Sequence, residues 1–190
     1  MPDLPIIEVR DQDAWRAWLE AHHTAHDAVW LKLAKKSSPE PSVSQPEAIE
    51  EALCFGWIDG QVRSYDEHHY LQRFTPRRVR SKWSQLNREK AERLIAAGRM
   101  HPAGLAQVEA AKADGRWEAA YPAQSQAQVP EDFQRALDEH PAARRFFQTL
   151  TGSTRYAFLY RLHQVRKPDA RAKRIARYIE LLSVGRTLDG

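Results

Sequence analysis

The sequence predicts an α+β protein, in which a small antiparallel sheet of about three strands is flanked by helices and followed by an all-helical C-terminal segment. Residues 28–36 alternate apolar and other side chains, as a half-buried strand does. Residues 57–74 are rich in extended-structure formers and broken by turn residues, and beyond residue 131 the apolar spacing is helical. A chain of 190 residues with 42% hydrophobic residues can bury a substantial core.

The first two predicted elements are a helix and a strand. Asp11 can cap a helix whose apolar face would include Trp15 and Leu19. In the strand at 28–36, Val29, Leu31 and Leu33 would share one face, with Trp30 and Lys32 on the other.

A second helix and further strands follow. Ser44 and Glu47 form a capping-box pattern at the start of the helix. Extended structure then runs through 57–74, and Asp66-Glu67 offers a turn within it. Asp59-Gly60 is either a hairpin turn or a bulge, and the pattern does not decide between them.

Two helices should close the N-terminal part. Ser81 or Ser84 can cap the first, and Pro102 begins the second. The apolar side chains that we expect to face inward are Leu86, Leu94, Ile95, Leu105 and Val108.

The predicted domain organisation has three parts. Residues 1–120 form the α+β domain, the uncharged stretch 121–130 is a linker, and 131–190 form the helical segment. In that segment Ser153 can cap one helix and Pro168 can begin the last one.

The composition narrows the class of protein. The chain shows no secretory signal pattern and no apolar run long enough for a membrane span, so we expect a cytoplasmic protein. The single cysteine, Cys54, lies in an apolar run and is interpreted as a buried, reduced thiol.

The net charge of +4 is unevenly distributed along the chain. Residues 61–99 carry ten basic and four acidic side chains, and residues 141–190 carry eleven basic and three acidic side chains. Such blocks either pack against acidic regions or bind phosphate-bearing partners.

The first candidate site is the basic loop FTPRRVRSKWS, residues 74–84. Arg77, Arg78 and Lys82 precede a predicted helix N-terminus, where backbone N–H groups also bind anions. Trp83 could provide a stacking face, or it could anchor the loop in the core.

The second candidate is Asp59, which the predicted strand pairing brings near Arg63, Arg73 and Arg77. A carboxylate among arginines stays ionised, which suits an ion pair better than proton transfer.

Two further clusters are weaker candidates. His22 and His26 are four residues apart and could share a helical face, but no further ligand completes a metal site, and none is predicted. A basic final helix could bind nucleic-acid backbone or an anionic membrane surface, or be only a solvated face. Its cations are Arg166, Lys167, Arg171, Lys173, Arg174 and Arg177.

Long motifs in the chain resemble the YdeI/OmpD-associated protein family. They are EALCFGWIDG, the run RFTPRRVRSKWSQLN from Arg73 to Asn87, and LIAAGRMHPAGLAQVEAAKADGRW, all within residues 51–117. The tail from Phe146 to Gly185 is similar to the C-terminal helical segment of that family. The resemblance implies a link to bacteriocin protection and to resistance against cationic antimicrobial peptides, with no established enzymatic activity and no cofactor.

The leading hypothesis is therefore a non-enzymatic protein that binds an anionic small molecule or a protein partner. The alternatives are a small enzyme acting on a phosphorylated or carboxylated substrate through Asp59 and nearby arginines, and a non-specific nucleic-acid binder. No catalytic residue is assigned, and the oligomeric state is open. The residues proposed to bind an anion are Asp59, Arg63, Arg73, Arg77, Arg78, Lys82, Trp83, Ser84 and Asn87.

Overall fold

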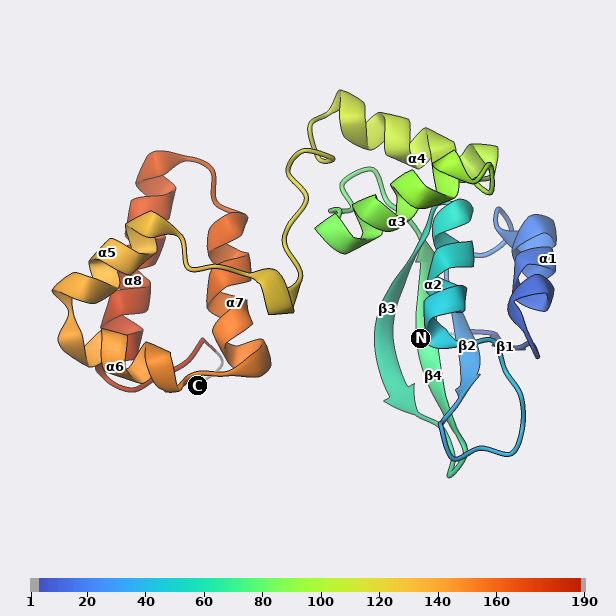
Figure 1. Cartoon of the computed structure of the whole chain (residues 1–190), viewed down its shortest axis with the longest axis horizontal. Coiled ribbons are helices and arrows are strands. Elements are labelled where there is room, and N and C mark those ends of the chain that lie inside the picture. The colour runs from blue at the N-terminus through green and yellow to red at the C-terminus, as the bar shows by residue number, and fades with distance from the viewer. Residues whose placement is uncertain (1–3, 189–190) are drawn as a thin grey trace. The chain divides into compact units, whose positions relative to one another are not determined.

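The structure is a computed structural model that describes residues 4–188 (Figure 1). It divides after Ala120 into two compact parts, called here the N-terminal unit and the C-terminal unit. Each unit has a separate hydrophobic core.

The N-terminal unit combines one sheet with four helices. The strand order is β1-β2-β4-β3, in which β1 pairs parallel to β2 and the other pairs are antiparallel. The elements are β1 (Ile6–Glu8), α1 (Gln12–His22), β2 (Val29–Ala34), α2 (Gln45–Cys54), β3 (Trp57–Ser64), β4 (His69–Pro76), α3 (Gln85–Ala96) and α4 (Pro102–Ala113). The predicted α+β class is confirmed, with a fourth strand, β1, whose three residues are too few to show a period.

The local signals at the helix starts are confirmed. The Asp11 carboxylate accepts a hydrogen bond from the Ala14 N–H, and Ser44 and Glu47 form the capping box. Of the two predicted caps for α3, Ser84 is the one used. The Asp59-Gly60 pair lies in an irregularity of the β3–β4 ladder between Asp59 and Val62, which makes it a bulge within one strand.

The helices all pack on one face of the sheet, called here the inner face. In Figure 1, α2 lies in front of the sheet and its axis runs in roughly the same direction as β2 and β4. Buried residues of α1, α2, α3 and α4 form one hydrophobic cluster with strand residues such as Leu31 and Phe74. The predicted face of residues 28–36 is confirmed, because Val29, Leu31 and Leu33 all belong to this cluster.

Three residues expected inside are at the surface instead. The exposed fractions are 51% for Leu86, 36% for Ile95 and 37% for Leu105. On α3 the core-facing residues are Ala91 and Leu94, which leaves Leu86 and Ile95 outside. On α4 the physical reason is close packing, because this helix contacts the core through the small residues Gly104 and Ala111 and through Val108. A Cβ atom at Gly104 would lie 2.1 Å from the Cys54 carbonyl oxygen, so the backbones of α4 and α2 nearly touch.

An ionic cluster in the N-terminal unit surrounds one buried carboxylate, that of Glu51. Glu51 of α2 is fully buried and accepts hydrogen bonds from Gln12 Nε2 at 2.7 Å and Arg16 Nη1 at 2.8 Å. Arg99 also pairs with Glu51, and Arg16 Nη2 donates to the Arg99 carbonyl oxygen. This cluster joins α1, α2 and the segment between α3 and α4.

The C-terminal unit is helical. After a short 3₁₀ turn at Gln124–Gln126 it contains α5 (Glu131–Glu139), α6 (Pro141–Thr149), α7 (Gly152–His163) and α8 (Pro168–Ser183). Its core is aromatic, since Phe133, Phe147, Phe158 and Tyr178 meet edge-to-face with centroids 4.9–6.1 Å apart. Pro168 begins α8 as predicted, but Thr151 and not Ser153 occupies the cap position of α7, because α7 already begins at Gly152. Within residues 4–188, no helix has the length and apolarity that a membrane span requires.

Candidate ligand-binding sites

The sheet has a second face that carries charged and aromatic side chains. Cross-strand pairing places Trp30 opposite Arg73, and Leu71 between Lys32 and Arg63. Since side chains alternate along a strand, these positions lie opposite the core-facing Leu31 and Phe74. We call this surface the outer face and define it by Trp30, Lys32, Arg63, His69, Leu71 and Arg73.

Arg63 and Trp30 form the centre of the outer face. The Arg63 guanidinium lies over the Trp30 ring, 4.3 Å from its centroid. Trp30 and Leu71 are 9% and 0% exposed, yet neither belongs to the two hydrophobic clusters. Stacking on an aromatic ring holds a guanidinium in one plane, so Arg63 presents its N–H groups in a fixed direction.

Arg73 adds a buried donor beside this stack. Its Nε is buried and has no hydrogen-bond partner within the described part of the chain. A buried N–H without an acceptor costs roughly 1–3 kcal/mol, so an incoming acceptor would be stabilising there. Lys32 lies on the same face and pairs with Glu8 at 3.3 Å.

His69 lies at the far end of the outer face, 6% exposed, beside a cavity of about 290 Å³. Its Nδ1 is 3.0 Å from Asp66 Oδ1, and its Nε2 is 3.3 Å from Glu40 Oε2. Partial burial opposes ionisation of Asp66, but hydrogen bonds from His68 and His69 outweigh it and hold the pKa of Asp66 below its usual value. Both ring nitrogens of His69 face carboxylates. This arrangement fixes the orientation of the ring and leaves neither nitrogen open to a ligand.

Asp59 lies away from these arginines. It pairs with Phe74 across the ladder and therefore projects on the inner face, where Gln72 Nε2 is 3.4 Å from its Oδ2. Arg63 and Arg73 project on the opposite face, so the sheet separates them from Asp59.

The basic loop is built around two of its own residues. Arg77 is 5% exposed, lies 3.7 Å from the Trp83 ring centroid and donates from Nη1 to the Lys82 carbonyl oxygen at 3.2 Å. Trp83 is 1% exposed and meets Trp117 edge-to-face at 4.9 Å. Trp83 therefore anchors the loop in the core, which is one of its two predicted roles. Arg77 is buried beneath the loop and stabilises it through these contacts.

The remaining residues of the predicted anion site either cap helix α3 or have side chains exposed to solvent. Ser84 accepts the Asn87 backbone N–H at 3.1 Å as the cap of α3. Arg78 and Lys82 have exposed side chains on the loop. The nine predicted residues thus belong to the loop, the α3 cap, the inner face and the outer face, and only Arg63 and Arg73 share the outer face.

The histidine pair is part of an aromatic stack. Trp18 stacks on His22 at 4.9 Å and on His26 at 5.5 Å, and His26 lies beyond the end of α1. Among residues 4–188, no three His, Cys, Asp or Glu side chains come together as a metal site would require.

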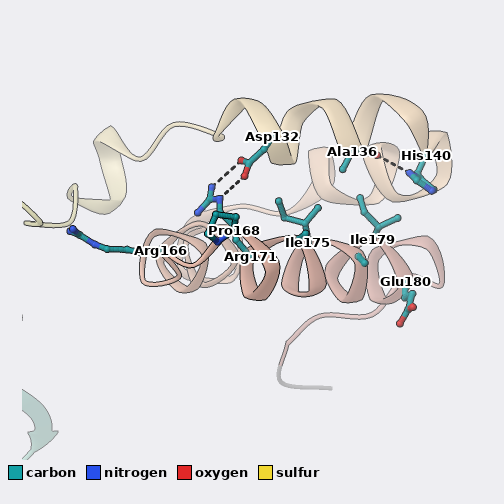
Figure 2. A pocket seen from close by; sticks show the side chains of 11 residues that line it. Asp132, Ala136, His140, Arg166, Pro168, Arg171, Ile175, Ile179 and Glu180 are labelled. Atoms are coloured by element: carbon teal, nitrogen blue, oxygen red, sulfur yellow. Dashed lines mark hydrogen bonds and ion pairs between the residues drawn. The ribbon is translucent and has the colours of Figure 1, made fainter.

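The C-terminal unit contains a groove of about 680 Å³ between α5 and α8 (Figure 2). At one end Arg171 pairs with Asp132, with Nη2 2.9 Å from Oδ1, and donates from Nη1 to the Leu162 carbonyl oxygen at 2.7 Å. Arg171, one of the six predicted cations, therefore fixes α8 to its neighbours. The sequence contains a signal for this groove, since Ala172, Ala176 and Ile179 follow helical spacing.

Two family models match the chain. Residues 7–107, more than half of the chain, match the domain of unknown function DUF8412. Residues 126–185 match the family described as "Bacteriocin-protection, YdeI or OmpD-Associated", which confirms the resemblance of the C-terminal helical segment to that family. Most of the motifs between residues 51 and 117 fall within the first match, and the second match covers the helices of the C-terminal unit. No curated protein and no solved structure matches the chain.

Proposed function

The chain belongs to the family of the domain of unknown function DUF8412, and we propose a function for it from its geometry. The N-terminal unit is a non-enzymatic module whose outer face binds a ligand that carries both an anionic group and a planar ring. The observation that carries the proposal is the arrangement of Arg63 and Arg73 around Trp30. A stacked guanidinium and a buried donor without an acceptor are together suited to one phosphate or carboxylate group.

The ring of the ligand follows from the aromatic content of this face. Arg63 covers Trp30, and a planar ring can stack on the outer side of the guanidinium or displace it from the indole. Lys32 lies 5.5 Å from the Tyr65 ring centroid, so a second cation is also held against an aromatic ring nearby.

Two observations favour binding over catalysis. His69 is held by carboxylates at both nitrogens, and Asp59 lies on the opposite face from the arginines. Neither residue is placed to exchange a proton with a ligand beside Arg63.

The biological setting that we propose follows the printed description of the second family. That description names bacteriocin protection and association with OmpD, and we extend to this chain the idea of a protein that binds partners.

The test is isothermal titration calorimetry of the full chain with adenosine monophosphate, ribose 5-phosphate and adenosine. The nucleotide should bind at least about tenfold more tightly than either fragment, because phosphate and ring are recognised together. Arg63→Ala and Arg73→Gln should each weaken binding by about tenfold.

Arg78→Ala is the matched control, since it removes an exposed arginine from the loop and leaves the outer face intact. Equal weakening by Arg78→Ala, or no binding by any of the three compounds, would overturn the proposal. Phosphate release that Asp59→Asn abolishes would instead support an enzyme. Binding only to DNA, with a steep loss in salt, would support the nucleic-acid alternative.

A further inference from the structure

We propose that the groove between α5 and α8 binds an amphipathic helix with acidic flanking residues, supplied by a partner protein. The inference concerns the C-terminal unit and is independent of the ligand proposed for the outer face.

The groove has straight helical walls. Figure 2 shows α5 and α8 side by side, with Asp132 facing Arg171 at one end and His140 near Ile179 at the other. The lining runs along α8 from Pro168 to Glu180, which corresponds to about 18 Å at about 1.5 Å per residue. That length matches a partner helix of about three turns.

The floor of the groove is apolar and recessed. Ala136, Ala172 and Ala176 line it together with Ile175 and Ile179, which are only 8% and 6% exposed. Alanine side chains allow a second helix to approach closely, within the usual interaxial distance of about 8–10 Å. An amphipathic helix that places apolar residues at i, i+4 and i+7 could fill the space.

A membrane surface fits this floor less well. Insertion into lipid requires apolar side chains that protrude, whereas Ile175 and Ile179 lie at the bottom of a concavity. The shape therefore favours a convex occupant over a lipid layer.

The charges around the groove favour an acidic partner. Lys173 and Arg177 are exposed, one turn apart on α8, and each follows directly after one of the lining alanines. Arg166 lies at the entrance beside Pro168. Asp132 is neutralised by Arg171, and the two acidic side chains of α8, Asp169 and Glu180, are outnumbered by Arg166, Lys173 and Arg177. On α5, Asp138 is paired with Arg144 at 3.2 Å, and Glu131 and Glu139 outnumber Arg135, so the positive charge lies on the α8 side of the groove.

The experiment measures fluorescence anisotropy of labelled helical peptides added to the full chain. One peptide has leucine and alanine on one face and glutamate on its flanks, and its matched control replaces every glutamate with lysine. The glutamate peptide should bind at least about tenfold more tightly than the lysine peptide.

Two variants locate the site. Ala176→Trp fills the groove from an exposed position and should weaken binding by about tenfold or more. Lys173→Glu/Arg177→Glu should reverse the preference between the peptides, whereas Arg145→Glu, an exposed change on α6, should leave it unchanged. Circular dichroism confirms that each variant is folded.

Equal binding of both peptides, or full binding by folded Ala176→Trp, would overturn the proposal. It would also be overturned if the chain bound vesicles of anionic phospholipid but neither peptide. Arg63→Ala should not change peptide binding, so this result and the nucleotide titration can fail independently.

Discussion

The two units place their polar groups in opposite ways. In the described chain, every buried polar or charged side chain belongs to the N-terminal unit: Glu51, His69, Gln72 and Arg77. The C-terminal unit buries aromatic and aliphatic side chains, and its ion pair between Asp132 and Arg171 is partly exposed. Hydrophobic burial stabilises without strong directionality, whereas a buried ion requires all its partners in place. The N-terminal unit should therefore respond sharply to single polar changes, and the C-terminal unit weakly.

The units can be observed separately, which makes this comparison measurable. All six tryptophans lie in residues 1–120, so tryptophan fluorescence follows the N-terminal unit alone. Circular dichroism follows the helices of both units.

The largest effect is expected from Glu51→Ala, which leaves Arg16 and Arg99 without their shared carboxylate. The free energy of unfolding of the N-terminal unit should fall by about 3 kcal/mol or more, near the lower end for a broken buried ion pair, because the side chains of Arg16 and Arg99 are 35% and 38% exposed. Urea unfolding followed by tryptophan fluorescence measures it. The control is Glu50→Ala, a more exposed neighbour that pairs with Arg93 at 3.3 Å and should cost no more than about 1 kcal/mol. Equal losses would mean that burial of the ions does not govern this unit.

Gly104→Ala tests close packing in the same unit. The new Cβ would lie 2.1 Å from the Cys54 carbonyl oxygen, so α4 must shift, at a cost of about 3 kcal/mol. At Gly98 the backbone φ is +65° with no atom within 4 Å, so alanine there meets only the backbone penalty of about 1 kcal/mol. The same urea titration compares them, and a smaller loss at Gly104 would contradict the close approach.

Arg77→Ala separates the buried and exposed parts of the basic loop. The variant loses the stacking on Trp83 and the hydrogen bond to the Lys82 carbonyl, and the expected destabilisation is about 2 kcal/mol. Arg78→Ala should stay within about 0.5 kcal/mol of the wild type. If the two variants unfold at the same urea concentration, Arg77 does not hold the loop.

The smallest effect is expected in the C-terminal unit, from Asp132→Asn. Hydrogen bonds from Arg171 lower the pKa of Asp132, so the folded state favours the ionised carboxylate. This contribution, about 1 kcal/mol, is present above the ordinary pKa of about 3.9 and is lost as the pH falls through the lowered value.

Thermal unfolding at a series of pH values measures this loss. The transition of the C-terminal unit is the one seen by circular dichroism without a change in tryptophan fluorescence. The difference between wild type and Asp132→Asn should vanish in acid, and a difference that persists at about pH 2 would rule out the ion pair as its cause.

The fold class and the helix starts could be predicted from sequence because they depend on short-range chemistry. The Ser44–Glu47 capping box and the alternation through 28–36 are complete within a few residues. The faces of α3 and α4 could not be predicted in the same way. The core contacts of α3 are Ala91 and Leu94, those of α4 include Gly104 and Ala111, and Leu86 and Leu105 stay outside. A large apolar side chain is buried only where the neighbouring helix or strand leaves enough space for that side chain.

The candidate sites depend more on long-range pairing, and the sequence was correspondingly less informative. Arg63 and Arg73 lie on one face of the sheet, but the bulge that sets the faces of β3 places Asp59 on the other face, and no local sequence pattern reveals this bulge. The buried position of Glu51 does have a local signal, because Glu51 lies three residues after Ala48 and four before Phe55, both buried.

The close contact between α4 and Cys54 has a further consequence. Cys54 is the only cysteine and is fully buried, and burial together with the nearby Glu51 raises the pKa of its thiol to about 11. A thiol reagent can therefore reach it only when the N-terminal unit opens. The rate of covalent labelling in the absence of denaturant would report how often that unit opens, and its slowing by a bound ligand would reveal binding without a label on the ligand.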